Sequence, residues 1–257
     1  MKEYHKINTI YKRDEKGNIL DSLFSTPEIE YLKDNVWEFT EKIDGTNIRV
    51  MWDGEEIRFG GKTDNAQIPA FLISRLQNLF RKEKLQFSFP VQDLNYPNIC
   101  FYGEGFGARI QKGGGNYIPN GVDFILFDIW VNGRWLKRQD IEEIGNKLGV
   151  RVVPLLGIGT IKDAVNMVQT GFNSTFGNFL AEGIVLKPMI QLFTRNFVLQ
   201  EEVQEGAINK NGANYCVSGF FLRVAFAPGL LLIDFLSFCV FFFKDFSFTS
   251  IICNNFS

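Results

Sequence analysis

The stretch from Val36 to Gly60, VWEFTEKIDGTNIRVMWDGEEIRFG, decides the fold more than any other part of the chain. Within it, two partly apolar runs, TNIRVMW and EEIRFGG, flank the dipeptide Asp53-Gly54. Asp-Gly between two such runs is a strong signal of a β-hairpin, because both central residues of its two-residue turn need positive φ. The stretch therefore predicts strands that pair antiparallel.

The same pattern continues on both sides of this stretch. Asn132-Gly133 separates DFILFDIWV from RWL, which predicts a second hairpin. Three segments show the 3.6-residue apolar spacing of helices: 68–84, 140–148 and 160–170. Gly149 and Gly171 are expected to stop the last two, and Thr160 to cap the third. Strands outnumber helices, so we expect an α+β domain of mainly antiparallel sheets with flanking helices.

The composition disfavours several kinds of chemistry. The 257 residues carry a net charge of -2, so contact with nucleic acid would need a local basic face. His5 is the single histidine and no two cysteines form a C-x-x-C pair, which argues against histidine catalysis, zinc sites and disulfide frameworks. The polar start, MKEYHKINTIYKRDEKGN, does not look like a signal peptide, and we expect a cytoplasmic monomer.

Residues 196–257 differ from the rest of the chain. Phenylalanine is frequent there, as in SFCVFFFKDFSF. Three interpretations stay open: a weak membrane anchor, a poorly formed hydrophobic extension, or an unrelated or frame-shifted C-terminus. Arg223, Pro228 and Asp234 interrupt the apolar run at 219–243, and charges are costly at the centre of a bilayer. We therefore favour the truncated or frame-shifted tail over the membrane anchor.

The segment EKIDGTN places Lys42 in a K-x-D-G pattern directly before a strand. A nucleophilic lysine must be neutral when it attacks, and a partly buried site beside cations favours the neutral amine. Asp44-Gly45 can form a tight turn that aims the lysine. The alternative is a lysine in a surface loop, and a pattern this short does not decide between them.

Three further motifs follow in order. They are FYGEGFG at 101–107, FILFDIW at 124–130 and AEGIVLKP at 181–188. In the first, glycines flank Glu104 and suggest that a ligand approaches the backbone. In order and spacing, EKIDGTN, FYGEGFG, FDIW and EGIVLKP resemble motifs I, III, IIIa and IV of the covalent nucleotidyltransferases. This superfamily contains DNA ligases, mRNA capping enzymes and RNA ligases. The four motif sequences are most similar to those of the RNA ligases.

The resemblance implies a nucleotidyltransferase domain over 1–195 that uses ATP and Mg²⁺ or Mn²⁺. Lys42 would attack the α-phosphate, expel pyrophosphate and hold AMP as a phosphoramidate, while Glu182 would help to bind the metal ion. AMP would then pass to an RNA 5′-phosphate end, and a 3′-hydroxyl would displace it. The other implied contacts are Glu41 on the adenine side, Asn47 near the reacting phosphate or RNA end, Lys62 on sugar or phosphate, Glu104 on the ribose hydroxyls, Phe127 stacked on adenine and Lys187 on phosphate.

Each implied contact also has a purely structural interpretation. Phe127 could be a core aromatic residue, and Glu104 could cap a turn. Lys62 and Asn47 could be solvated hairpin or turn residues, and Lys187 before Pro188 could simply end a strand. The sequence leaves these alternatives open.

One expected motif is missing. The family has a K-x-K pair, motif V, a couple of dozen residues after motif IV, and its lysines hold the α-phosphate. After Lys187 the chain has only Lys210 and Lys244, which form no such pair. Loss of one preorganised phosphate ligand costs about 10²–10³ in rate, so we expect weak or absent activity. The alternatives are a non-catalytic nucleotide- or RNA-binding remnant and a DNA ligase-type or capping-type enzyme.

Overall fold

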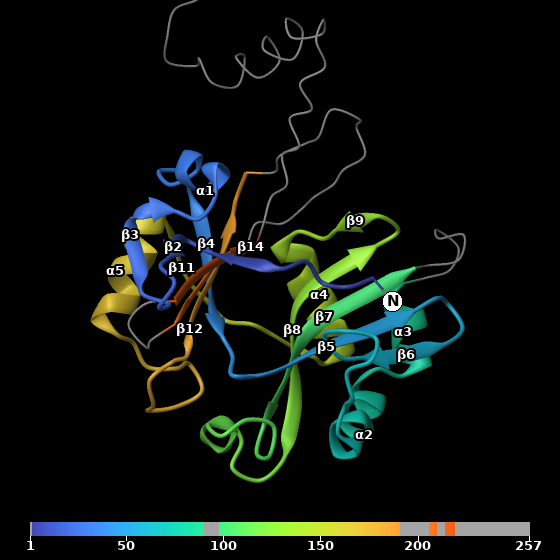
Figure 1. Cartoon of the computed structure of the whole chain (residues 1–257). Helices are drawn as coiled ribbons and strands as arrows, with labels where there is room; N and C mark the ends of the chain where they lie inside the picture. The colour runs from blue at the N-terminus through green and yellow to red at the C-terminus, as the bar shows by residue number, and fades with distance from the viewer. Residues whose placement is uncertain (1, 90–97, 191–205, 210–213, 219–257) are drawn as a thin grey trace, which may run out of the picture. The chain divides into compact units, whose positions relative to one another are not determined.

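The computed structural model describes residues 2–89, 98–190, 206–209 and 214–218 (Figure 1). Its first sheet has six strands. In spatial order these are β1 (Ile7–Thr9), β14 (Asn214–Ser218), β13 (Gly206–Asn209), β12 (Gly183–Pro188), β4 (Trp37–Lys42) and β11 (Leu155–Gly159). Every pairing along this order is antiparallel.

The second sheet also has six strands. Five lie in the order β10 (Arg151–Val152), β8 (Val122–Val131), β7 (Ile99–Gly107), β5 (Gly45–Trp52) and β6 (Ile57–Gly60), and β9 (Arg134–Trp135) pairs with β8. Only the short β10 pairs parallel among them. A small antiparallel hairpin joins β2 (Tyr11–Arg13) and β3 (Ile19–Phe24). The predicted α+β fold of mainly antiparallel sheets is confirmed.

Both predicted hairpins are present. The loop that links β5 to β6 has four residues, 53–56, instead of the predicted two, and within it Gly54 has a φ of 98° while Asp53 does not have a positive φ. Asn132-Gly133 links β8 to β9 with φ values of 46° and 96°. Asparagine is one of the few residues besides glycine that adopts this conformation readily, so the local chemistry sets these turns.

Two of the three predicted helices are confirmed. α4 (Arg138–Leu148) ends at Gly149 in the left-handed conformation, and α5 (Ile161–Thr170) ends at Gly171. Thr160 caps α5 in a capping box with Asp163. The prediction of one helix over 68–84 is wrong, because the segment forms two helices, α2 (Ala70–Leu79) and α3 (Lys82–Ser88). Two short elements were not predicted: α1 (Pro27–Tyr31) and the 3₁₀ helix η2 (Gly114–Asn116).

The break between α2 and α3 follows from the burial of Phe80. Its ring lies 5.1 Å from the ring of Phe101 and 5.5 Å from that of Phe124, between centroids. The backbone leaves the helical region at Phe80 and is extended at Arg81, with φ -103° and ψ 145°. Packing of one aromatic ring into the core therefore overrides the helical propensity of its neighbours.

One face of the second sheet is apolar, and α2, α3 and α4 contribute to its core. On this face a Cβ at Gly103 would lie 2.2 Å from Phe124, and one at Gly105 would lie 2.6 Å from Leu72. Both positions therefore need glycine because of core packing. This corrects the interpretation of these glycines as ligand-approach residues, while Glu104 between them points to the opposite face.

One face of the first sheet packs against α5. Trp37 and Phe39 of β4 share a core with Ile184 and Leu186 of β12 and with residues of α5 such as Ile161. Alternation along a strand sends every second residue to the opposite face. Lys42 and Lys187 lie on that opposite face, which carries the candidate site.

The predicted boundary at residue 195 precedes two strands of the first sheet, β13 and β14. The compact unit that contains both sheets extends from Met1 to Phe221. The run at 219–243, on which the membrane-anchor interpretation depended, lies outside the described residues. Among the residues that are described, none of the helices has the length and apolar character needed to cross a bilayer.

Candidate active site

Lys42 is the last residue of β4, and its amine forms an ion pair with the carboxylate of Glu182, directly before the neighbouring strand β12. Nζ contacts Oε1 of Glu182, and the register of β4 and β12 places Lys42 opposite Gly183. The side chains of Lys42 and Glu182 are 33% and 19% exposed. A ligand can therefore reach the amine, which a buried structural ion pair would not allow.

The turn after Lys42 is held from two sides. The backbone N–H of Asp44 donates to the hydroxyl of Tyr117 at 3.2 Å, and the side chain of Gln111 donates to Gly45 O at 3.0 Å. A Cβ at Gly45 would lie 2.3 Å from Gly105 O, so only glycine fits. Gly45 therefore permits the close approach of β5 to β7 directly after Lys42. Asp44 forms a bend and Gly45 already begins β5, so the segment is not the tight turn that the sequence predicted.

Glu104 lies in the middle of β7, opposite Asn47 of β5. Burial raises the pKa of its carboxyl group to about 8, Lys42 opposes this rise, and Glu182 and Asp44 add to it. A Cβ at Gly45 would lie 2.8 Å from Cγ of Glu104, so the side chain of Glu104 lies beside the segment that follows Lys42. The structure therefore brings together the three residues on which the ligase hypothesis depends.

The raised pKa of Glu104 predicts a pH-dependent stability of the ligand-free chain. In the unfolded chain the carboxyl ionises near 4.5, and in the folded chain near 8. Between these values the folded state keeps a proton that the unfolded state has released, so the free energy of unfolding falls as pH rises through this window. We expect a loss of about 2–4 kcal/mol from this group between pH 4.5 and 8.5.

Urea unfolding at several pH values measures this loss. Glu104→Gln should remove most of the pH dependence in the window, because the amide mimics the protonated acid. Glu83→Gln, on the exposed surface of α3, should keep the wild-type dependence. If both variants behave alike, the carboxyl of Glu104 is not the group that titrates.

Two buried side-chain oxygen atoms of the predicted site residues have no hydrogen-bond partner among the described residues. They are Oε2 of Glu182 and Oδ1 of Asn47. Buried acceptors are normally paired, so these atoms fit a ligand that supplies a cation or hydroxyl groups. Across the described part of the chain, no group of three or more His, Cys, Asp or Glu forms a metal site. One carboxylate oxygen still suits Mg²⁺ or Mn²⁺ when substrate phosphates and water complete the shell.

A β-bulge in β8 brings Phe127 and Asp128 to the same face. Tyr102 pairs with Asp128, whereas Gly103 pairs with Leu126, so Phe127 has no partner in β7. Phe124 and Leu126 enter the helix-covered core, but Phe127 and Asp128 both face away from it. The extra residue of a bulge interrupts the alternation of side chains, so two successive residues can point to the same face. Phe127 is partly buried and lies on the site face, and its adenine contact stays a prediction.

Lys187 lies on the same face as Lys42 and pairs with Asp128. Nζ of Lys187 lies 2.6 Å from Oδ1 of Asp128, which is fully buried. This ion pair links the end of β12 to β8 of the second sheet. Lys187 therefore does more than end a strand at the surface. Its contact with phosphate stays a prediction.

Glu41 points to the other face of the first sheet. Its carboxylate is 1% exposed and accepts hydrogen bonds from Ser174 Oγ at 2.5 Å, Thr175 N at 2.9 Å and Thr175 Oγ1 at 2.6 Å. These bonds hold the loop before β12. The nucleotide contact implied for Glu41 stays a prediction, and its side chain already has a structural role.

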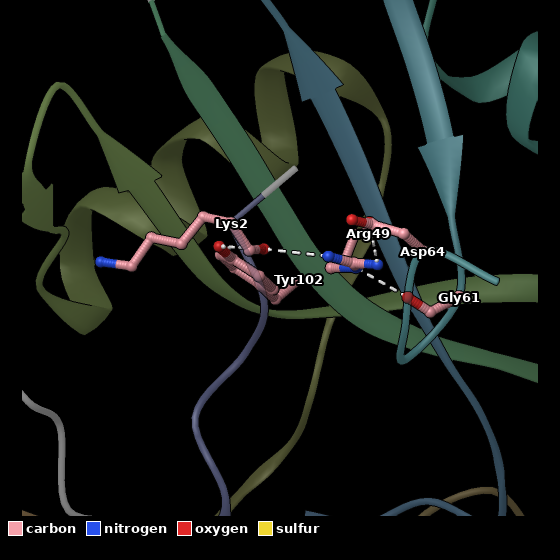
Figure 2. A network of polar contacts seen from close by, with 5 residues as sticks. All are labelled: Lys2, Arg49, Gly61, Asp64 and Tyr102. Atoms are coloured by element: carbon pink, nitrogen blue, oxygen red, sulfur yellow. Dashed lines mark hydrogen bonds and ion pairs between the residues drawn. The ribbon is translucent and has the colours of Figure 1, made fainter. Parts of the chain in front are cut away.

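Lys62 is exposed and its charge acts on Glu104. Arg49 holds the loop on both sides of it: Nε donates to Gly61 O at 2.6 Å and Nη2 to Asp64 at 2.9 Å (Figure 2). Sequence reasoning missed Arg49 and Asp128. The available signal was a charged residue within an apolar strand, in IRVMW and in FILFDIW, since such charges are buried only when paired.

Known proteins are similar to this chain in sequence and in fold. The sequence model of the RNA ligase family matches residues 35–207. A search of curated proteins finds no match. Thirty-seven solved chains are similar to it in structure. The three described next are structures of an RNA ligase from Naegleria gruberi.

A lysine-to-alanine variant of that ligase with ATP and Mn is 24% identical, with a TM-score of 0.53, over 75% of this chain and 60% of that one. A glutamate-to-alanine variant with ATP and Mn is 21% identical, with a TM-score of 0.55, over 82% and 60%. The ligase with PPi is 22% identical, with a TM-score of 0.52, over 75% and 57%. These identities show a shared fold, and the chain spans about 60% of the length of the first of these ligases.

Proposed function

The chain belongs to the RNA ligase family, and we propose that it is an ATP-dependent adenylyltransferase of the RNA ligase type, with Lys42 as the residue that receives AMP. One observation carries the proposal. The partly exposed amine of Lys42 lies against Glu182, and its charge acts on the carboxyl of Glu104. The second carboxylate oxygen of Glu182 is buried and has no partner in the described structure, which an ion pair with a purely structural role would not leave beside it.

In the proposed first step, the lone pair of Nζ attacks the α-phosphorus of ATP. The N–P bond forms, the bond to the pyrophosphate oxygen breaks, and pyrophosphate leaves. Oε1 of Glu182 already contacts Nζ and is placed to accept its proton. A Mg²⁺ or Mn²⁺ ion held by Glu182 and the nucleotide phosphates would neutralise charge on the departing pyrophosphate.

The other residues of the site bind and orient the nucleotide in this proposal. Glu104, protonated near neutral pH because of its raised pKa, can both donate to and accept from ribose hydroxyls. Phe127 offers a ring to the base, and Lys62 and Lys187 offer charge to the phosphates. In the second step, the AMP passes to an RNA 5′-phosphate, and a 3′-hydroxyl then displaces it to seal the strand.

The missing K-x-K pair limits the expected rate. The sequence after Lys187 holds Lys210 and Lys244 only, and both lie outside the described residues. Loss of one such lysine costs about 10²–10³ in rate, so without both we expect adenylylation to be slower by at least that factor. This observation also favours a second candidate function, a remnant that binds nucleotide or RNA without catalysis.

Labelled nucleotide distinguishes these functions. The full chain is incubated with α-labelled ATP and Mg²⁺ or Mn²⁺, and labelled protein and released pyrophosphate are measured. We expect slow, equal appearance of both, and mass spectrometry should map AMP to the peptide that contains Lys42. Binding of ATP without pyrophosphate release would support the remnant, and an adduct with GTP in place of ATP would support a capping-type enzyme.

A further inference from the structure

The segment Lys2–His5, which we call the arm, lies against the site face of the second sheet. The carbonyl oxygen of Lys2 accepts hydrogen bonds from Arg49 Nη1 at 3.4 Å and from the hydroxyl of Tyr102 at 3.1 Å (Figure 2). The amine of Lys2 lies over the rings of Trp130 and Trp135, 4.7 Å and 5.1 Å from their centroids. The beginning of the arm is therefore fixed by both its backbone and its side chain.

Tyr4 connects the arm to the acidic residue that holds Lys187. Its hydroxyl donates to Oδ2 of Asp128 at 2.7 Å, while Oδ1 of the same carboxylate binds Lys187 at 2.6 Å. Its ring lies 5.0 Å from that of Phe127, edge on. Asp128 is fully buried, so Tyr4 helps to set the orientation of a carboxylate that water does not reach.

Arg49 connects the other end of the arm to Lys62. Its guanidinium is completely buried and reaches Lys2 O on one side and Gly61 O and Asp64 on the other (Figure 2). Lys62 lies between these last two residues in the sequence. The arm thus reaches both lysines assigned to phosphate through one intermediate residue. Asp128 binds both Tyr4 and Lys187, and Arg49 binds both Lys2 O and Gly61 O, next to Lys62.

We propose that the arm is a positioning element for the nucleotide phosphates, which acts on Lys187 through Tyr4 and Asp128 and on the Lys62 loop through Arg49. This inference rests on the proposed function. A lysine side chain has many rotamers, and its charge serves a phosphate only while those rotamers are restricted. A carboxylate held by Tyr4 restricts Lys187, whereas a carboxylate free to rotate does not.

The test uses Tyr4→Phe, which removes the hydroxyl and keeps the ring contacts. Tyr31→Phe, on the surface of α1, is the matched control. Equilibrium binding of ATP with Mg²⁺ is measured for both and for Lys187→Met alone and combined with Tyr4→Phe. We expect Tyr4→Phe to weaken binding about 5–10-fold, Tyr31→Phe to leave it unchanged, and Tyr4→Phe to have no further effect once Lys187 is replaced.

A purely structural role for Tyr4 predicts a different result, namely equal weakening with and without Lys187. That outcome, or wild-type binding by Tyr4→Phe, would overturn the proposal. The lost hydroxyl can also lower stability, so unfolding is measured alongside and binding is compared well below the unfolding temperature.

A second measurement needs no nucleotide. Acetylation of the ligand-free chain by a lysine-reactive ester is followed residue by residue with mass spectrometry. We expect Tyr4→Phe to speed acetylation of Lys187 about 3–10-fold and to leave exposed Lys82 unchanged. An unchanged rate at Lys187 contradicts the positioning role even if AMP transfer occurs. A faster rate without any AMP adduct in the wild-type chain supports the arm and counts only against the proposed function.

Discussion

Lys42→Arg should abolish transfer of AMP to the protein while leaving the fold intact. The guanidinium keeps the positive charge beside Glu182, so the ion pair and the electrostatic environment of Glu104 are largely preserved. It does not attack phosphorus, because arginine stays protonated at any accessible pH. We expect labelled protein to fall by more than about 10³-fold, below detection, with an unchanged unfolding midpoint.

Two further variants distinguish the role of Lys42 as a nucleophile from the role of its positive charge. Lys42→Ala should also form no adduct, and it should destabilise the chain slightly because it leaves the carboxylate of Glu182 without its cation. Lys82→Ala, on the exposed surface of α3, should label as the wild type does. Labelling of Lys42→Arg at the wild-type level would mean that another residue receives AMP, and the assignment of the site would have to be withdrawn.

Arg49→Met should lower the free energy of unfolding by about 2–4 kcal/mol. The side chain of Arg49 is completely buried, and its guanidinium is the donor to Gly61 O, Lys2 O and Asp64. Methionine keeps an unbranched apolar stem but leaves two backbone carbonyl groups without that donor. The cost stays below that of breaking a fully buried ion pair, because Asp64 is 61% exposed and water can solvate it.

Arg58→Met is the matched control for this substitution. Arg58 lies on the adjacent strand β6, is 52% exposed, and pairs with Asp53 within the hairpin. Exposed ion pairs contribute little, so we expect a loss of less than about 1 kcal/mol. Urea unfolding of the two variants measures the difference, and equal losses would show that the Arg49 network does not stabilise the fold.

Features that depend on residues close together in the chain could be predicted from the sequence. Asp53-Gly54 and Asn132-Gly133 specify hairpins because few residues adopt positive φ. Thr160 and Gly149 specify helix ends because a side-chain cap and a left-handed glycine act within one turn. The order of the four motifs also indicated that Lys42, Glu104 and Glu182 would meet, and the absence of a K-x-K pair is a fact of sequence alone.

The tertiary structure alone decided the features that depend on residues far apart in the chain. Burial of Phe80 against Phe101 ends α2 where no glycine or proline marks a break. The pairing of β7 with β8 leaves Phe127 as the extra residue of a bulge. The bulge places Asp128 on the face where it contacts Lys187 and Tyr4. These outcomes depend on how side chains fill a shared space, and local sequence patterns carry no information about which distant residue fills it.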